Sequence, residues 1–306
     1  DLRMSRGLGD VYKRQAFRKI IKENGVDTVH THFTDMKTDM CVNIACLGLR
    51  VKKFKHYRSS FGSFGTIKKF FARLCYRSWN AVICVSPHIM REAESNIVSC
   101  KPVLLNDAVY FPRMDNYEKL CKPDLGVPEG AVLCFAIGYD YRLKGIDLAC
   151  EAVKKLRDEG LNIYLAICTA SNTQTIAEQI RAQFGEFPEW LKLLPPRQDI
   201  ASYYRAADIY IQASRSEGFC YAIVEAAYCG KTVVASDCPG MKSHAEKNFD
   251  FLWFKNGDSD SLSEKLGQAV KMSESSELSA KNRRSAIDNY SIENMSKKLH
   301  RIYADM

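Results

Sequence analysis

The sequence predicts an α/β protein with two domains. From Ala16 onward, short apolar runs rich in β-branched residues alternate with amphipathic stretches, which is the pattern of strand and helix units around parallel sheets. The alternation lapses between Asn106 and Glu129, where three prolines interrupt it, and then begins again. With 306 residues, of which 46% are hydrophobic, the chain can give each domain a core of its own.

Each series contains its own set of predicted elements. The first begins with a helix from Ala16 to Asn24-Gly25, and its strands are expected at 27–30, 53–57, 81–85 and 102–105. The second has a helix over 144–159, and its strands are expected at 131–137, 162–168, 208–212, 232–235 and 251–254. Because strands and helices alternate through the second series, it predicts a complete doubly wound sheet.

The domain boundaries follow from these series. We expect a first domain at 16–122, a second at 123–290 and, at 291–306, a C-terminal helix whose apolar face packs back towards the first domain. Residues 1–15 have no apolar periodicity, and the segment 11–15 resembles a translated sequencing adapter. We therefore expect 1–15 to be a non-native scar that takes no part in the fold.

The composition narrows the class of protein. None of the twelve cysteines forms a C-x-x-C pair and most lie in apolar stretches, so we expect reduced core thiols in a cytoplasmic protein. No apolar run approaches the roughly 18 residues that cross a bilayer, which places the chain free in the cytoplasm or peripherally at the inner face of the membrane. The six histidines form no H-x-x-x-H pair, and Asp258-Ser259-Asp260 suits a helix start better than a metal site. We therefore expect no metal.

The net charge of +8 comes from one segment. Between Arg50 and Arg77 there are nine lysines or arginines and no acidic residue, interleaved with aromatic and aliphatic side chains. Such a segment resembles a surface that meets anionic lipid headgroups, and we expect residues 50–77 to do so. A solvated helix face is the alternative. Nothing else in the chain favours nucleic acid as a partner.

The strongest chemical signal lies between the strands at 208–212 and 232–235. A helix from about Phe219 is apolar on all sides except at Glu225, so it should be buried together with that carboxylate. A buried carboxylate requires donors, which can come from the hydroxyls of a ligand or from an arginine or lysine. An ion pair with Lys231 is the structural alternative.

Residues around this helix suit a diphosphate. Glu217 precedes the helix, and Gly218 lets free backbone N–H groups approach a ligand at the positive helix end. Lys144 lies in a second loop between a strand and a helix, flanked by Gly138 and Gly145. It can supply a neutralising positive charge.

These segments together resemble a known family. Glu217 and Glu225, with Gly218-Phe219 between them, look like the E-x7-E signature of retaining GT-B glycosyltransferases, family four. Three further segments agree: 137–147 resembles the G-R-x4-K-G phosphate loop, 82–86 the "viavS" strand, and 105–106 the "PNG" hinge. The likeness runs from Ala16 to Tyr303.

The resemblance implies a fold and a set of roles. The fold is two facing Rossmann-like doubly wound domains, with the donor held by the C-terminal domain and the acceptor by the N-terminal one. Glu217 would hold sugar hydroxyls, Lys144 would neutralise the diphosphate, and Glu225 would bind the ribose diol. Backbone contacts would come from Gly218, Phe219 and Cys220, phosphate contacts from Gly138 and Arg142, and a histidine near the reacting sugar from His56.

Four departures qualify the transfer of these roles. Tyr139 stands where the family has arginine, so that Arg142 becomes the second phosphate cation, and Cys220 and Asp107 stand where it has glycine. Members of the family begin with a strand, a glycine-rich loop and a helix, which come before the position equivalent to Ala16. This sequence has no counterpart of these three elements. We therefore expect the N-terminal domain to be truncated and incomplete.

The sequence thus predicts a bacterial enzyme that moves a sugar from a nucleoside-diphosphate sugar to an acceptor hydroxyl with retention of configuration. We expect no metal cofactor, and a glycan or lipid-linked acceptor in envelope polysaccharide or lipopolysaccharide synthesis. The alternative is a nucleotide-sugar-binding fragment or pseudoenzyme without transfer activity. A GT-B relative of another reaction type, such as an epimerase or phosphorylase, is a further alternative.

Overall fold

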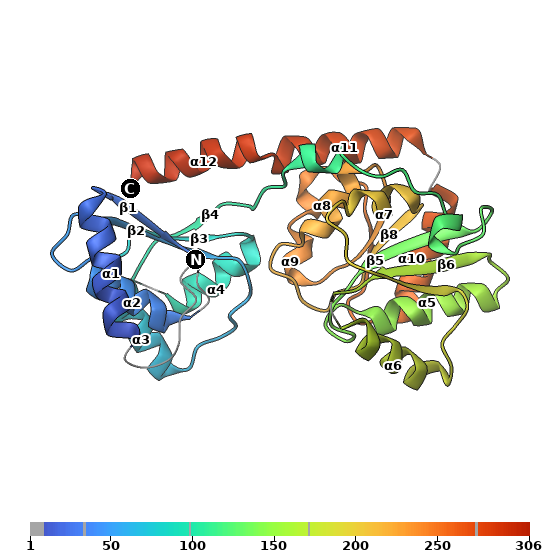
Figure 1. Ribbon diagram of the computed structural model, residues 1–306, viewed down its shortest axis with the longest axis horizontal. Coiled ribbons are helices and arrows are strands. Elements are labelled where there is room, and N and C mark those ends of the chain that lie inside the picture. Colours follow the sequence, from blue (N-terminus) through green and yellow to red (C-terminus); the bar gives the residue numbers. More distant parts are fainter. Residues whose placement is uncertain (1–8, 33–34, 98, 171, 273–274) are drawn as a thin grey trace. The chain divides into compact units, whose positions relative to one another are not determined.

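The chain forms two compact units. The computed structural model describes residues 9–32, 35–97, 99–170, 172–272 and 275–306 (Figure 1). One unit contains the chain up to Asn106 together with Lys297–Met306, and the other contains Asp107–Ser296. The division therefore falls within the predicted hinge, earlier than the expected 122/123 boundary. The final helix, α12 (Ile292–Asp305), begins in the second unit and ends in the first.

The first unit is built on a four-stranded parallel sheet in the order β1-β2-β3-β4. Its strands are β1 (Thr28–Thr31), β2 (Lys52–Tyr57), β3 (Ala81–Cys84) and β4 (Pro102–Leu104), all four of which the sequence predicts. Its helices are α1 (Gly9–Glu23), α2 (Met36–Ala45), α3 (Thr66–Tyr76) and α4 (Pro87–Asn96). The prediction that the first helix begins at Ala16 is wrong, because α1 begins at Gly9; residues 1–8 lie outside the described part.

The second unit is built on a six-stranded parallel sheet in the order β10-β9-β8-β5-β6-β7. Its strands are β5 (Val132–Ile137), β6 (Ile163–Cys168), β7 (Leu191–Leu194), β8 (Ile209–Gln212), β9 (Thr232–Ser236) and β10 (Leu252–Phe254). Its α-helices are α5 (Ile146–Asp158), α6 (Thr173–Phe184), α7 (Ala201–Ala206), α8 (Tyr221–Tyr228), α9 (Pro239–Lys242), α10 (Ser259–Met272) and α11 (Ser276–Tyr290). Three short 3-10 helices are η1 (Phe111–Met114), η2 (Pro123–Leu125) and η3 (Ala245–Lys247).

The six-stranded sheet is covered on both faces, as a doubly wound sheet requires. On one face, Cys134 of β5 belongs to an apolar core with α5 and α10 (Figure 1). On the other face, the neighbouring Phe135 packs against Tyr204 of α7 and Tyr210 of β8, with ring centroids 5.3 and 5.9 Å away. Adjacent residues of β5 therefore point to opposite layers, which explains why the strand is apolar throughout.

The basic segment 50–77 is not one surface, contrary to our expectation. Lys53 and Lys55 belong to β2 and are buried. The Nζ atom of Lys55 lies 2.7 Å from Oδ2 of Asp39, and neither side chain is exposed. The Nζ atom of Lys53 donates to Oδ1 of Asn43 and to Oγ of Ser78. The exposed basic and aromatic residues of this segment are therefore mainly those of α3.

Helix α3 has an unusual exposed face. Its buried residues Ala72, Cys75 and Tyr76 face the unit. The opposite side exposes large apolar residues at helical spacing, namely Ile67, Phe70, Phe71 and Leu74. We call these four residues the α3 stripe. No described helix has the length and apolar content that a membrane crossing needs.

The twelve cysteines are all free thiols, and ten of them are buried. Burial raises the pKa of several, such as Cys168 and Cys229, each to about 11. This confirms the prediction of core thiols in these positions. Cys121 is the exposed exception.

Candidate functional site

Two loops meet at the point where the strand order of the second sheet reverses. The chain runs from β5 outward through β6 and β7 and then returns to place β8 on the other side of β5. Ligands of open α/β sheets bind outside the carboxyl ends of the strands at such a switch point. The loop 138–145 follows β5, and the loop 213–220 follows β8.

An ion pair joins these two loops. Nζ of Lys144 lies 2.7 Å from Oε1 of Glu217, and the two side chains are only 15% and 12% exposed. The same carboxylate oxygen accepts hydrogen bonds from Oγ of Ser214 at 2.7 Å and from Nε2 of Gln212 at 3.3 Å. Burial alone would lower the pKa of Lys144, but the charge of Glu217 and the hydrogen bond to it raise that pKa overall. Lys144 therefore carries its positive charge at neutral pH.

The backbone of the second loop is held from the side of α9 and η3. A Cβ atom on Gly240 would lie 1.7 Å from the carbonyl oxygen of Glu217, so only glycine fits there. The ring of His244 donates from Nε2 to the carbonyl oxygen of Phe219. The Phe219 side chain is buried and meets the rings of Tyr290 and His244.

Cys220 explains one of the departures seen in the sequence. Its backbone has φ 68°, in the left-handed region that favours glycine. The positive φ explains why the family pattern has glycine at this position. In this chain a cysteine adopts the same conformation. Helix α8 begins after it, at Tyr221, two residues later than the expected start at Phe219.

Glu225 has partners other than the expected lysine. Its carboxylate, 8% exposed, forms an ion pair with Nη2 of Arg113 and accepts a hydrogen bond from the Tyr204 hydroxyl at 3.1 Å. Lys231 instead donates to the carbonyl oxygens of Arg205 and Ala207, so the ion pair suggested for it is not formed. Arg113 is in η1, 112 residues earlier. No local pattern in the sequence links the two positions.

Arg142 lies in the first loop but is bound to a neighbouring carboxylate. Its Nη1 is 2.7 Å from Oδ2 of Asp147. Both oxygens of the Asp147 carboxylate also accept hydrogen bonds of 2.8 Å from the guanidinium of Arg215. Arg215 was not singled out in the sequence. Its backbone N–H donates to the carbonyl oxygen of Leu143 at 2.9 Å, so it ties the two loops together as well as adding charge.

Gly138 lets the start of the first loop pack closely against Ile146 and Lys144. A Cβ atom there would lie 2.9 Å from Cδ1 of Ile146 and 3.3 Å from Cβ of Lys144. The ring of Tyr139, which stands where the family has arginine, lies under the Lys144 ammonium at 5.1 Å. Tyr139 therefore supports Lys144 through a cation–π contact and adds no positive charge.

His56 is in the first unit, on β2, and is almost completely buried. Its ring centroid lies 5.3 Å from that of His30 and 5.1 Å from that of His32. Burial, together with the neighbouring His32 and Arg58, lowers the pKa of His56 to about 3. His30, His32 and His56 thus lie together, with one ring nitrogen from each within 4.8 Å of the others. The expectation of no metal stays a prediction.

Comparisons with known proteins show to which family the chain belongs. Residues 120–299 match the family Glycosyl transferases group 1. A Campylobacter jejuni N,N'-diacetylbacillosaminyl-diphospho-undecaprenol alpha-1,3-N-acetylgalactosaminyltransferase is 38% identical over 73 residues, which are 24% of this chain and 19% of that protein. A D-inositol 3-phosphate glycosyltransferase of Corynebacterium kroppenstedtii is 33% identical over 140 residues, 43% of this chain and 31% of that protein. The matched region thus spans less than a third of either relative.

Solved structures share the fold over nearly the whole chain. A glycosyltransferase from Rickettsia africae has a TM-score of 0.86 at 18% identity and covers 100% of this chain and 83% of its own. Anabaena HepE in complex with UDP has a TM-score of 0.82 at 16% identity and covers 98% of this chain and 84% of its own. The chain belongs to the glycosyl transferases group 1 family and has the GT-B glycosyltransferase fold.

Proposed function

We propose that the chain binds a nucleoside-diphosphate sugar at the carboxyl ends of β5 and β8 and transfers the sugar to an acceptor hydroxyl with retention of configuration. The observation that carries this proposal is the contact between Lys144 and Glu217 at the switch point of the sheet. A cation for phosphate and an acceptor for sugar hydroxyls lie next to each other there, beside the start of α8.

In this proposal each group has a separate role. Lys144 turns from Glu217 to the diphosphate, and the free N–H groups at the start of α8 add to the positive potential. Glu217 then accepts hydrogen bonds from sugar hydroxyls, and Glu225 accepts them from the ribose. The leaving diphosphate is stabilised by preorganised donors, so the donor site requires no metal.

The resemblance to the family signature supports retention, and we propose attack on the same face of the sugar from which the diphosphate leaves. The acceptor hydroxyl would form the new glycosidic bond at the anomeric carbon as the bond to the diphosphate breaks. Its proton would pass to a leaving phosphate oxygen. His56 lies in the first unit, and its place near the reacting sugar stays a prediction.

A thermal-shift screen with UDP, GDP, ADP and their sugars tests donor binding. One base should stabilise the chain, by about 2.7 kcal/mol at a ligand concentration one hundred times Kd. Lys144→Met should remove most of the shift, and Lys154→Met is the matched control, because Lys154 is an α5 lysine paired with Asp158 on the surface. Stabilisation by no nucleotide, or equal shifts in both variants, would disprove the donor site.

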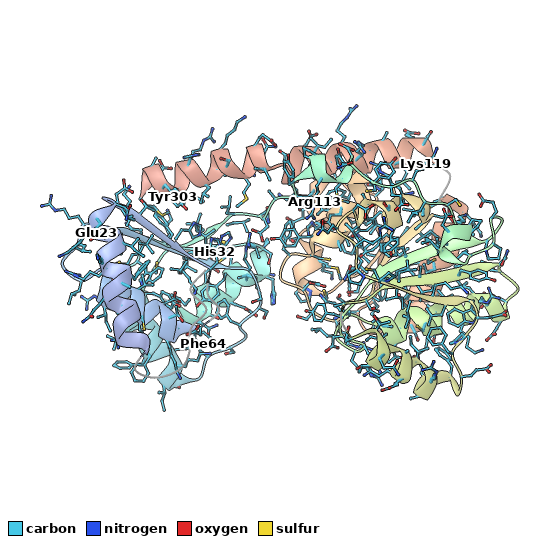
Figure 2. The ribbon with its side chains drawn as sticks, viewed as in Figure 1. Glu23, His32, Phe64, Arg113, Lys119 and Tyr303 are labelled. Carbon is cyan, nitrogen blue, oxygen red and sulfur yellow. The ribbon has the colours of Figure 1, made fainter. Side chains whose placement is uncertain are left out.

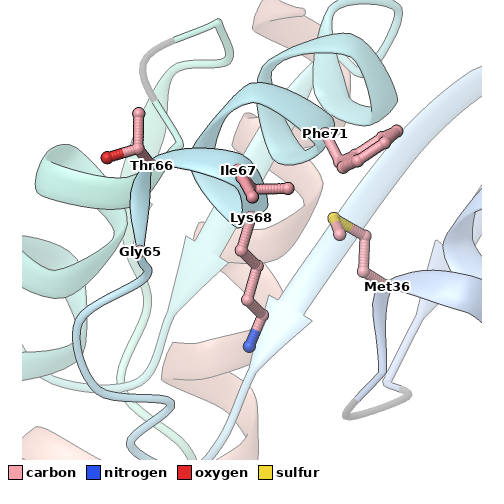
Figure 3. A pocket seen from close by; sticks show the side chains of 6 residues that line it. All are labelled: Met36, Gly65, Thr66, Ile67, Lys68 and Phe71. Atoms are coloured by element: carbon pink, nitrogen blue, oxygen red, sulfur yellow. The ribbon is translucent and has the colours of Figure 1, made fainter.

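We further propose a lipid-linked acceptor in envelope polysaccharide or lipopolysaccharide synthesis, reached from the inner face of the membrane. The name of the Campylobacter relative includes a sugar linked to diphospho-undecaprenol. The α3 stripe offers an apolar surface with lysines and arginines at its sides, which suits an anionic bilayer. At its N-terminal end is an open hollow of about 560 Å³ lined by Met36, Gly65, Thr66, Ile67, Lys68 and Phe71 (Figure 3).

The alternative function is nucleotide-sugar binding without transfer. Cys220 in a left-handed conformation favours it, since its side chain occupies a position where a glycine would let sugar approach the backbone. Incubation of the chain with the stabilising nucleotide sugar and a polyprenyl-diphosphate-linked sugar in vesicles separates the two functions. Transfer that Glu217→Ala abolishes supports the enzyme, whereas donor binding without any glycosylated product supports the binding protein.

A further inference from the structure

Three histidines of the first unit converge although they come from two strands. His30 lies on β1, and His32 follows two positions later, so that both side chains point to the same face. Strand β2 runs parallel to β1 with Phe54 opposite His30, which places His56 beside His32. One ring nitrogen from each of the three can be chosen so that all three atoms lie within 4.8 Å of one another.

The ring of His30 is oriented by a residue of the last helix. Its Nδ1 forms a hydrogen bond with the hydroxyl of Tyr303, and its Nε2 is buried without a hydrogen-bond partner among the described residues. Figure 2 labels Tyr303 on α12 and His32 after β1. A metal-bound histidine typically has this arrangement, in which one nitrogen is held by a neighbouring group and the other points at the ion.

The cluster suits a cation better than an anion. Three ring nitrogens that lie within 4.8 Å of one another can offer their lone pairs to a single metal ion. A buried imidazole nitrogen that lacks a partner is also costly in a purely structural cluster.

We propose that His30, His32 and His56 bind a divalent transition-metal ion of the zinc class. Three imidazole ligands with an open fourth position form the ligand set of carbonic anhydrase zinc. Zinc–nitrogen bonds of about 2.0–2.1 Å require the three nitrogens to lie closer together than the 4.8 Å within which they now fall. His32 is exposed, so an ion can enter from its side.

The metal site does not depend on the proposed transferase activity. Its ligands lie in the first unit, whereas Lys144, Glu217 and Glu225 lie in the second. His56 is the one residue that belongs to both proposals. Loss of metal binding and loss of nucleotide binding can therefore be measured separately on the same chain.

Titration of the chelator-treated chain with Zn²⁺ by calorimetry, and with Co²⁺ by absorption, tests the proposal. We expect one saturable equivalent, with visible cobalt bands and without the near-ultraviolet band of a cobalt–thiolate bond. His32→Ala should weaken binding at least tenfold. His300→Ala is the matched control, because His300 is an exposed histidine of α12, and it should bind as the unchanged chain does.

A second variant tests the orientation of His30. Tyr303→Phe should keep the ring contact with Phe54, whose centroid is 4.8 Å away, and remove only the hydroxyl. We expect metal affinity to fall about ten- to a hundredfold, as for other groups that orient a ligand. Absence of saturable binding, a cobalt–thiolate band, or His32→Ala and His56→Gln proteins that fold and bind with unchanged affinity would overturn the proposal.

Discussion

Gly145 packs directly against the carbonyl oxygen of Ala213: a Cβ atom built on Gly145 would lie 1.9 Å from that oxygen. The backbone of Gly145 also has φ 65°, which disfavours any other residue. Gly145 follows Lys144 in the chain, and Ala213 follows β8. This contact sets how closely the two loops of the candidate site approach each other.

Gly145→Ala should therefore destabilise the second unit by about 3 kcal/mol or more and weaken nucleotide binding, because the backbone of one loop must move. Urea unfolding measures the first effect and the thermal shift with nucleotide the second. Gly160→Ala is the matched control, since Gly160 has φ 95° but nothing within 4 Å of an added Cβ. Gly160→Ala should lower the free energy of unfolding by only about 1 kcal/mol. Equal losses of stability in both variants would contradict the close contact between Gly145 and Ala213.

His244 should make stability depend on pH. It is fully buried, and its pKa falls to about 4: burial lowers it, the hydrogen bond to Phe219 raises it, and Lys247 lowers it. His244 takes up a proton near pH 6.5 in the unfolded chain but only near pH 4 in the folded chain. The free energy that neutral His244 contributes to folding is therefore complete above pH 6.5 and is lost as the pH falls towards 4. The contribution to the slope is up to about 1.4 kcal/mol per pH unit.

His244→Gln keeps an N–H donor for Phe219 but removes the titration. Urea unfolding between pH 4 and 7 should therefore show a smaller slope for this variant than for the unchanged chain. His300→Gln, at an exposed position, should leave the slope as it is. Identical slopes for all three proteins would contradict a neutral buried His244.

The α3 stripe should bind anionic vesicles. Burying Phe70 and Leu74 in the interface would contribute a few kcal/mol, since a fully buried side chain of this size is worth about 1.5–3 kcal/mol. The double variant Phe70→Ser, Leu74→Ser should reduce recovery in vesicle flotation at least tenfold. Leu47→Ser, which changes an apolar residue that is 74% exposed and lies outside the stripe, is the control. Equal recovery with neutral and anionic vesicles would exclude the proposed lipid surface.

The alternation of strands and helices was sufficient to predict most of the sheets. Strand β7 was missed because it is an edge strand whose four residues include no β-branched side chain and lie between Pro188 and Pro195. Lys53 and Lys55 misled the interpretation of segment 50–77, because a lysine in a strand looks exposed until its buried partner is known. For Lys55 that partner is Asp39, from a different element.

The candidate site was predictable only where its residues follow strands in a recognisable spacing. Lys144 and Glu217 do so, and the structure brings them together. Arg113 was missed because it lies in η1, outside any strand and helix unit. The histidine cluster was missed because it depends on the pairing of two strands, although His30 and His32 at alternate positions were a usable signal.

Glu225 should decide how the site distinguishes a ribose from a deoxyribose. A carboxylate that accepts hydrogen bonds from both ribose hydroxyls loses one of them when the 2′-hydroxyl is absent, and a hydrogen bond to a charged group is worth about 1.5–3 kcal/mol. The unchanged chain should bind the 2′-deoxy form of its nucleoside diphosphate at least about tenfold more weakly, as measured by calorimetry. Glu225→Ala should bind both forms almost equally.

Arg113→Met separates this role from the ion pair that Glu225 forms. The variant removes the cation but keeps the carboxylate, so it should lower the free energy of unfolding because a buried charge loses its partner. It should nevertheless retain the preference for ribose. If Glu225→Ala also keeps that preference, Glu225 is only the structural partner of Arg113, and the ribose must be recognised by another residue.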